Sequence, residues 1–216
     1  MSRVIFIESG GVKLDALGGH QYRNTSETSH SFDDVDLGAS SSSGLLVIGA
    51  GIIGSPTSEV NSLTVNGSSA TQVASAAGGG RSAKFFQITG QSGTGDIAVE
   101  CAAGATQWFL GLWKLRGVQS TTAAATGTKV GSLTESPLTV AFDVPKLGAG
   151  IAFMIGDVTG GGTTWSGLTE DFEITDAING RGTGASLKFN TAQTALSVSA
   201  TTTITGRGML VGASWR

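Results

Sequence analysis

Charged residues are scarce in this chain. They make up 13% of its 216 residues, about half of the roughly 25% that is usual for soluble domains. The net charge is −3 and lysines and arginines do not cluster, so we expect no nucleic-acid partner, because binding needs cations that neutralise phosphates. A surface this poor in charge must be built from Ser, Thr, Gly and Ala or be covered by other subunits. The composition therefore predicts assembly, including a homo-oligomer.

Cysteine and histidine are nearly missing as well. The single cysteine, Cys101, excludes an internal disulfide and a multi-cysteine metal site. It alternates with Ile97 and Val99 along one strand, so we expect a small buried hydrophobic side chain there. The two histidines, His20 and His30, are too few for a zinc site. We expect neither a metal nor a cofactor.

Long apolar runs do not occur either. None approaches the eighteen or so residues of a transmembrane helix, and the apolar stretch within residues 3–8 is too short for a signal peptide. The sequence therefore predicts no membrane association. It predicts a protein that is made and kept in a cytoplasm, or that leaves it by a route other than secretion.

Glycine and strand-length apolar runs are abundant instead. The 34 glycines are more than twice the roughly 7% average, and short apolar runs recur between Gly, Ser and Thr while a helical period does not persist. Residues 138–144 alternate strictly, as in a half-buried strand, whereas residues 108–115 are apolar on both faces, as in a central strand. The pattern predicts an all-β fold, an antiparallel β-sandwich of jelly-roll type.

A polar junction divides the chain. Residues 39–44 read Ala-Ser-Ser-Ser-Ser-Gly, a flexible composition. Before it, residues 3–8 and 12–14 predict a hairpin closed by Gly-Gly, and residues 18–30 are polar without a period. We predict an N-terminal arm or edge element over residues 1–40 and a sandwich domain over residues 41–216.

Residues 49–54 spell the dinucleotide-binding pattern G-x-G-x-x-G after an apolar strand. The motif needs a helix that begins within it, so that helix amides face the pyrophosphate. Pro56 would fall in the first turns of that helix, and no Asp or Glu lies between residues 59 and 96 to bind the ribose. The interpretation is a sandwich strand whose glycines let other groups approach closely.

Acidic residues offer two weak alternatives for chemistry. His30 lies near Asp33, Asp34 and Asp36, which could form a hydrolytic, metal or calcium cluster, although a solvated strand edge is the favoured interpretation. A glycosidase would need two carboxylates on opposite sides of a bond, and nothing in the sequence brings two together. The candidates are Glu100, Asp143, Glu170, Asp171 and Glu173.

Aromatic residues offer sugar-stacking surfaces. Trp108 and Trp113 are an odd number of positions apart, so they point to opposite faces of one strand and at least one belongs to the core. Trp165 lies beside a glycine-rich loop and is the best exposed candidate for stacking on a glycan, although core or interface packing is the favoured interpretation.

Six phrases of the sequence occur in a characteristic order: DLGAS (36–40), LTVNG (63–67), GDIAV (95–99), LTVAFDVP (138–145), TWSGLTED (164–171) and GASWR (212–216). Together they resemble accessory structural proteins of tailed bacteriophages. The resemblance spans roughly residues 36–216 and is a pattern of phrases rather than a catalytic signature. Such proteins are capsid decoration or cement proteins, head fibres or tail adsorption components with a β-sandwich domain.

The resemblance implies a virion protein that is assembled in the host cytoplasm. We expect a non-enzymatic outer capsid decoration or cement protein, bound to the major capsid protein or another virion protein. Its arm would lie across neighbouring subunits and add main-chain hydrogen bonds and apolar contacts from Val4, Ile5, Phe6 and Ile7. The alternative is a tail or fibre module that binds host surface glycans through Trp165.

Overall fold

The computed structural model describes residues 11–40, 44–175 and 179–216. All regular structure in these ranges is β-strand, and every strand pairing is antiparallel. The predicted all-β, sandwich-like fold is therefore confirmed. In the same ranges there is no helix of a length and apolarity that would cross a bilayer.

The largest sheet contains seven strands. Its order is β4-β3-β7-β2-β6-β5, and β1 pairs with the other edge of β7. The strands are β1 (Lys13–Asp36), β2 (Leu45–Gly54), β3 (Val60–Val65), β4 (Ser68–Ser69), β5 (Thr71–Gly78), β6 (Arg81–Thr89) and β7 (Thr94–Arg116).

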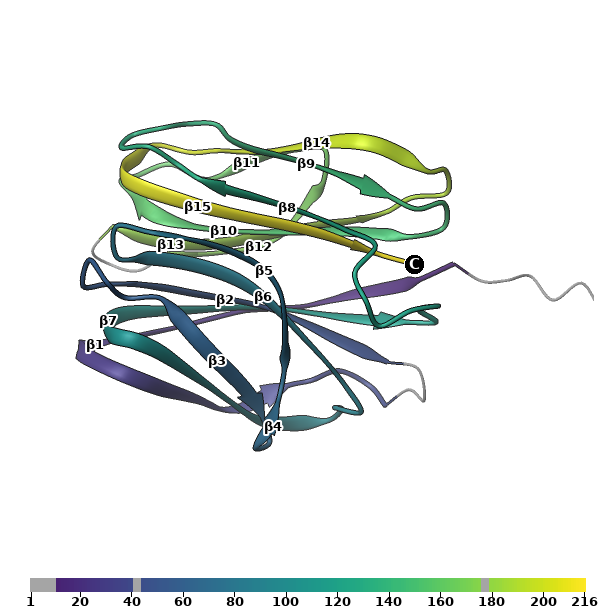
Figure 1. The fold of residues 1–216 in the computed structure, drawn as a ribbon, viewed down its shortest axis with the longest axis horizontal. Helices are drawn as coiled ribbons and strands as arrows, with labels where there is room; N and C mark the ends of the chain where they lie inside the picture. Colours follow the sequence, from purple (N-terminus) through teal and green to yellow (C-terminus); the bar gives the residue numbers. More distant parts are fainter. Residues whose placement is uncertain (1–10, 41–43, 176–178) are drawn as a thin grey trace, which may run out of the picture.

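A bend in β7 curls this sheet over itself. The first half of β7 pairs with β3, its second half pairs with β2, and β1 follows both halves. The register with β2 shifts at Gly54, opposite Ala105, and β1 shifts register around Glu27. As a result, β3 and β4 lie below the plane of β2 and β6 (Figure 1).

Two further sheets complete a stack. The five-stranded sheet has the order β12-β13-β10-β15-β8, and the three-stranded sheet has the order β11-β14-β9. Figure 1 shows the three-stranded sheet on top, the five-stranded sheet in the middle and the curled sheet below. The strands are β8 (Ala125–Val130), β9 (Leu138–Val144), β10 (Ala149–Val158), β11 (Thr164–Ser166), β12 (Thr169–Thr175), β13 (Gly180–Lys188), β14 (Gln193–Thr201) and β15 (Ile204–Trp215).

Each gap in the stack is filled by its own apolar core. Phe142 belongs to the core between the upper two sheets, and Phe153 belongs to the core between the five-stranded sheet and the curled sheet. A third core, which includes Trp108, lies inside the curl. The middle strands therefore bury both faces, and β10 and β15 are buried along most of their length.

The glycines of the dinucleotide-like pattern lie in the middle of β2, which continues as a strand to Gly54. A Cβ on Gly49 would lie 2.6 Å from the ring of Phe153, and one on Gly51 would lie 2.4 Å from a methyl carbon of Ile155. Side chains of β10 thus occupy the space that a larger residue would need. This confirms the interpretation of a strand that other groups approach closely.

Several side-chain orientations also agree with the sequence. Trp108 and Trp113 lie in different cores, on opposite faces of β7, and β9 alternates buried and exposed positions over its whole length. Cys101 is buried and its Sγ donates a hydrogen bond to the carbonyl of Ala103 at 2.7 Å. Burial raises the pKa of the Cys101 thiol, as expected for an unreactive side chain.

The N-terminal element differs from its predicted form. Residues 18–30, which lack a period, belong to one long strand over residues 13–36 that occupies an edge of the curled sheet. Phe32 and Val35 are buried in the core of the curl, so this part is an edge element that contributes to the core. Residues 3–8 of the predicted hairpin lie outside the described residues, and the domain boundary at residue 40 stays a prediction.

Candidate functional site

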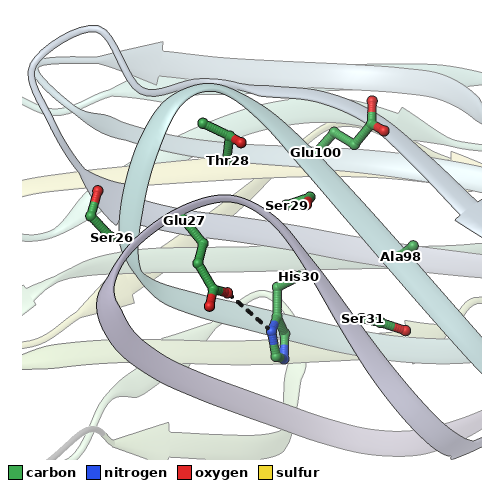
Figure 2. Close-up of a pocket in the computed structure, with 8 residues that line it drawn as sticks. All are labelled: Ser26, Glu27, Thr28, Ser29, His30, Ser31, Ala98 and Glu100. Atoms are coloured by element: carbon green, nitrogen blue, oxygen red, sulfur yellow. Dashed lines mark ion pairs between the residues drawn. The ribbon is translucent and has the colours of Figure 1, made fainter.

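A polar depression of about 730 Å³ lies where β1 bends. The register of β1 against β7 shifts on both sides of Glu27, so the backbone loops outward there and leaves a hollow against β7 (Figure 2). Six consecutive residues of β1 and two of β7 form the walls. They are Ser26, Glu27, Thr28, Ser29, His30, Ser31, Ala98 and Glu100.

His30 is the most enclosed polar side chain of the depression. Its ring stacks on Tyr22, with centroids 3.6 Å apart and planes within 7°, and meets Phe32 edge-on at 4.7 Å. Nδ1 lies 3.7 Å from a carboxylate oxygen of Glu27 (Figure 2). Burial lowers the pKa of His30 and outweighs the opposing effect of Glu27. The neutral imidazole is therefore favoured, at the rim of the core inside the curl.

The hydroxyl groups of the depression do not form a catalytic triad with His30. Ser31 donates to Asp33 at 2.8 Å, and Glu100 accepts a hydrogen bond from Ser62 at 2.9 Å. Within the described residues, no serine hydroxyl is hydrogen-bonded to His30, whereas a nucleophile must reach its base. The arrangement instead offers hydroxyl and carboxylate groups that could bind a polar ligand.

The alternative cluster of His30 with the neighbouring aspartates is not assembled. Asp33 accepts from Ser31, and Asp36 accepts the backbone N–H of Gly38 at 2.8 Å. In the described ranges, no three His, Cys, Asp or Glu side chains are placed to hold one metal ion. These aspartates are exposed, as the solvated-edge interpretation expects.

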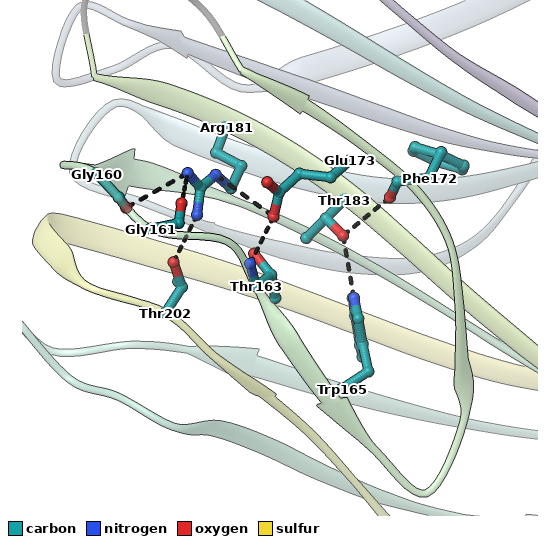
Figure 3. Close-up of polar contacts among 9 residues, drawn as sticks. All are labelled: Gly160, Gly161, Thr163, Trp165, Phe172, Glu173, Arg181, Thr183 and Thr202. Atoms are coloured by element: carbon teal, nitrogen blue, oxygen red, sulfur yellow. Dashed lines mark hydrogen bonds and ion pairs between the residues drawn. The ribbon is translucent and has the colours of Figure 1, made fainter.

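Trp165, the predicted glycan-stacking residue, is half-buried in β11. Its indole Nε1 donates to the Thr183 hydroxyl at 3.0 Å, and that hydroxyl donates to the carbonyl of Phe172 at 3.0 Å (Figure 3). The ring packs against the core between the upper two sheets. Its polar group thus points into the protein, so Trp165 has a packing role here, and its binding of a glycan stays a prediction.

A buried arginine beside Trp165 was missed by the sequence reasoning. Arg181 is 3% exposed and donates hydrogen bonds to the Thr202 hydroxyl at 2.8 Å and to the carbonyl of Gly161. Its Nε lies 3.6 Å from Glu173, which also accepts the backbone N–H of Thr163 at 2.6 Å (Figure 3). Arg181 therefore fastens the glycine loop after β10. The only signal was one cation within the small-residue strand GRGTGAS.

The candidate glycosidase carboxylates are dispersed or already engaged. Glu100 and Asp143 are exposed on separate sheets, and Glu173 binds Arg181. Asp171 accepts a hydrogen bond from Trp113 Nε1 at 2.6 Å, and burial raises the pKa of its carboxyl. Burial, and after it the charge of Glu173, likewise raises the pKa of Glu170. Burial, together with the neighbouring charge at Glu170, accounts for the raised pKa values of these two carboxyl groups.

Comparisons with known proteins identify no relative. No family model, no curated protein and no solved structure matches the chain. The resemblance to phage accessory proteins therefore stays a prediction. The predicted attachment residues Val4, Ile5, Phe6 and Ile7 lie outside the described residues.

Proposed function

We propose that the protein is a non-enzymatic structural component of a tailed-phage virion, most simply an outer capsid decoration or cement protein. It would be assembled in the host cytoplasm and bind the major capsid protein or another virion protein, alone or as a homo-oligomer. One observation carries the proposal: the outward face of the three-stranded sheet is a β-surface of short side chains. The resemblance of the sequence phrases points in the same direction.

That outward face is built from the alternation of two paired strands. Thr139 and Ala141 point away from the core in β9, opposite Ser199 and Ser197 of β14, and the hydroxyls of Thr139 and Ser199 lie 2.9 Å apart. Short side chains lose little rotamer entropy when a partner covers them, whereas long charged side chains lose up to about 2 kcal/mol each. The face is therefore suited to docking against another protein.

The position of the protein on the virion can be measured by counting. The number of copies per purified virion is expected to be in the hundreds for a capsid decoration protein, and a few or a few dozen for a tail or fibre part. A Thr139→Arg, Ser199→Arg variant should bind capsids less tightly, because both arginines would stand in the middle of the face. Thr71→Arg, on an exposed position of β5, is the matched control. Absence from virions, or undiminished binding by the double variant, would contradict the proposal.

The attachment segment is tested separately. Replacing Val4, Ile5, Phe6 and Ile7 by serine leaves the residues of β1 unchanged and should weaken binding to capsids, since the apolar contacts would be lost while the main-chain groups remain. Deleting residues 2–10 should have the same effect. A longer deletion that removes the whole N-terminal element up to residue 38 cannot test attachment, because it would also remove Phe32 and Val35 from the core inside the curl. Unchanged affinity of the serine variant would remove this segment from the proposal.

A second candidate function is a tail or fibre module that binds host glycans, and the depression at the β1 bend favours it. Hydroxyl and carboxylate groups line the depression, as in sites that bind a polar ligand, whereas the indole N–H of Trp165 is already hydrogen-bonded within the protein. On a glycan array, binding that is lost in Glu27→Gln and kept in Trp165→Phe would support this function at the depression. Binding that is lost only in Trp165→Phe would place the glycan site at Trp165 instead of the depression. Absence of any glycan binding would reject this second candidate function.

A further inference from the structure

We propose that a groove at the start of β1, flanked by lysines, binds an acidic and partly apolar peptide segment of a partner protein. This inference rests on the proposed function in one respect: it assumes that the protein binds a partner protein, and it gives the chemistry of that partner's surface. The groove has a volume of about 240 Å³ and lies between the first described residues and the turn that joins β9 to β10. It is lined by Gly11, Val12, Lys13, Leu147, Gly148, Lys188, Phe189 and Asn190.

Backbone hydrogen bonds hold the walls of this groove. The N–H of Val12 donates to the carbonyl of Leu147 at 3.0 Å, and the N–H of Phe189 donates to the carbonyl of Gly148 at 2.9 Å. Three segments that are distant in the sequence are thus fixed side by side. A preformed groove loses less entropy on binding than one that must be ordered first.

Unpaired positive charge surrounds the groove. Lys13 and Lys188 line it, and Lys146 lies in the adjacent turn; all three are exposed. None of the three forms an ion pair or a side-chain hydrogen bond with any residue that the structure describes. By contrast, Arg81 and Lys129 are paired with carboxylates. In a chain of net charge −3, this is a local positive patch.

Charge complementarity and the apolar lining together select the partner. Leu147 and Phe189 provide an apolar surface for one aliphatic or aromatic side chain, while the ammonium groups at the rim attract flanking carboxylates. Rim ion pairs contribute about 0.2–1 kcal/mol each and are screened by salt. A nucleic acid fits less well, because three lysines release few counterions and an apolar floor offers nothing to a phosphate. An acidic peptide with interspersed Leu or Phe uses both features.

The test uses the full chain and a fluorescent peptide in which Glu alternates with Leu and Phe, with a second peptide in which Lys replaces Glu. The acidic peptide should bind, and its affinity should fall as salt is raised. The variant Lys13→Glu, Lys188→Glu should weaken binding at least about tenfold, since two attractions become repulsions of similar size. Arg207→Glu is the matched control, since it reverses a cation elsewhere that pairs with no residue in the described part of the chain, and it should change binding by less than about twofold.

Each outcome separates this inference from the virion proposal. Salt-sensitive binding that is lost in the double variant supports the groove, even if the protein is absent from virions. No binding of the acidic peptide, equal binding of both peptides, or equal affinity of the double variant overturns the groove, even if hundreds of copies are counted on capsids. Both substituted side chains are exposed, and a thermal unfolding curve for each variant shows that the fold is intact.

Discussion

Adding one methyl group at Gly49 should destabilise the protein measurably. The new Cβ would lie 2.6, 2.8 and 3.0 Å from Cγ, Cδ1 and Cβ of Phe153. Rotation of the ring cannot relieve this clash, because Cβ is bonded to the backbone of β10 and Cγ is bonded to Cβ. Overpacking of a well-filled core costs about 1–3 kcal/mol. We expect Gly49→Ala to fall within this range.

A double-mutant cycle identifies the clash as the cause. Phe153→Ala alone should cost about 3–5 kcal/mol because it opens a cavity. In the double variant the methyl group meets no ring, so the combined loss should be smaller than the sum by roughly 0.5–3 kcal/mol. Urea unfolding, followed by tryptophan fluorescence with a common m value, gives each free energy. Additive losses, or a Gly49→Ala protein as stable as the parent, would refute the packing explanation of the glycine pattern.

Four other perturbations test the electrostatics. Arg181→Met should lower the free energy of unfolding by about 3 kcal/mol, because a buried charge pair is broken and Glu173 is left without its partner. Amide hydrogen exchange should rise in the loop at Gly160 and Gly161. The control Lys188→Met should change neither quantity. Burial lowers the pKa of both His20 and His30. The free energy of unfolding should therefore be highest above the unfolded pKa of 6.5 and fall as pH drops below it. Denaturant unfolding measured at several pH values should show a smaller loss in His30→Asn. Hydrogen bonds from Lys129 and Ser132 hold the pKa of Glu135 at about 2. Its contribution to stability should be complete above the unfolded value of 4.5, decline progressively as pH falls from 4.5 towards about 2, and be absent below that, and Glu135→Gln should lose it already at neutral pH in denaturant titrations. Asp171→Asn should shift the tryptophan emission, since it removes the carboxylate that accepts the indole N–H of Trp113 at 2.6 Å, and an unchanged spectrum would contradict that contact.

Local sequence patterns were sufficient to predict the structure where the alternation within one strand decides which side chains are buried. The alternation over residues 138–144 predicted which side of β9 is buried, and the odd spacing of Trp108 and Trp113 predicted opposite faces. Pro56 and the missing acidic residue were enough to read residues 49–54 as a strand. The sequence could not predict which side chains pack against these glycines, because Phe153 and Ile155 lie about a hundred positions away in the chain.

The sequence was less informative where pairing with a distant strand decides the structure. Residues 18–30 are polar, yet they form part of β1 because β7 offers a free edge along its whole length. Backbone hydrogen bonds do not depend on side-chain pattern, so an edge strand can be polar on both faces. The depression also depends on pairing with a distant strand. No motif marked Ser26, and His30 was noted only for the aspartates that follow it, whereas the register shift around Glu27 brings Ser26 and His30 to one hollow.

The bend of the curled sheet links the candidate site to the stability of the fold. At this bend β1 must pass around the turn of β7, and the residues at and beside its register shifts form the wall of the depression. The same bend places Tyr22 and His30 face to face and lets Phe32 and Trp108 close the core inside the curl. A ligand that binds His30 in the depression would therefore also hold the two halves of β1 together. Ligand binding at this site should raise the unfolding midpoint by mass action, whereas a ligand in the lysine groove would stabilise the opposite end of β1 and leave the His30 titration unchanged.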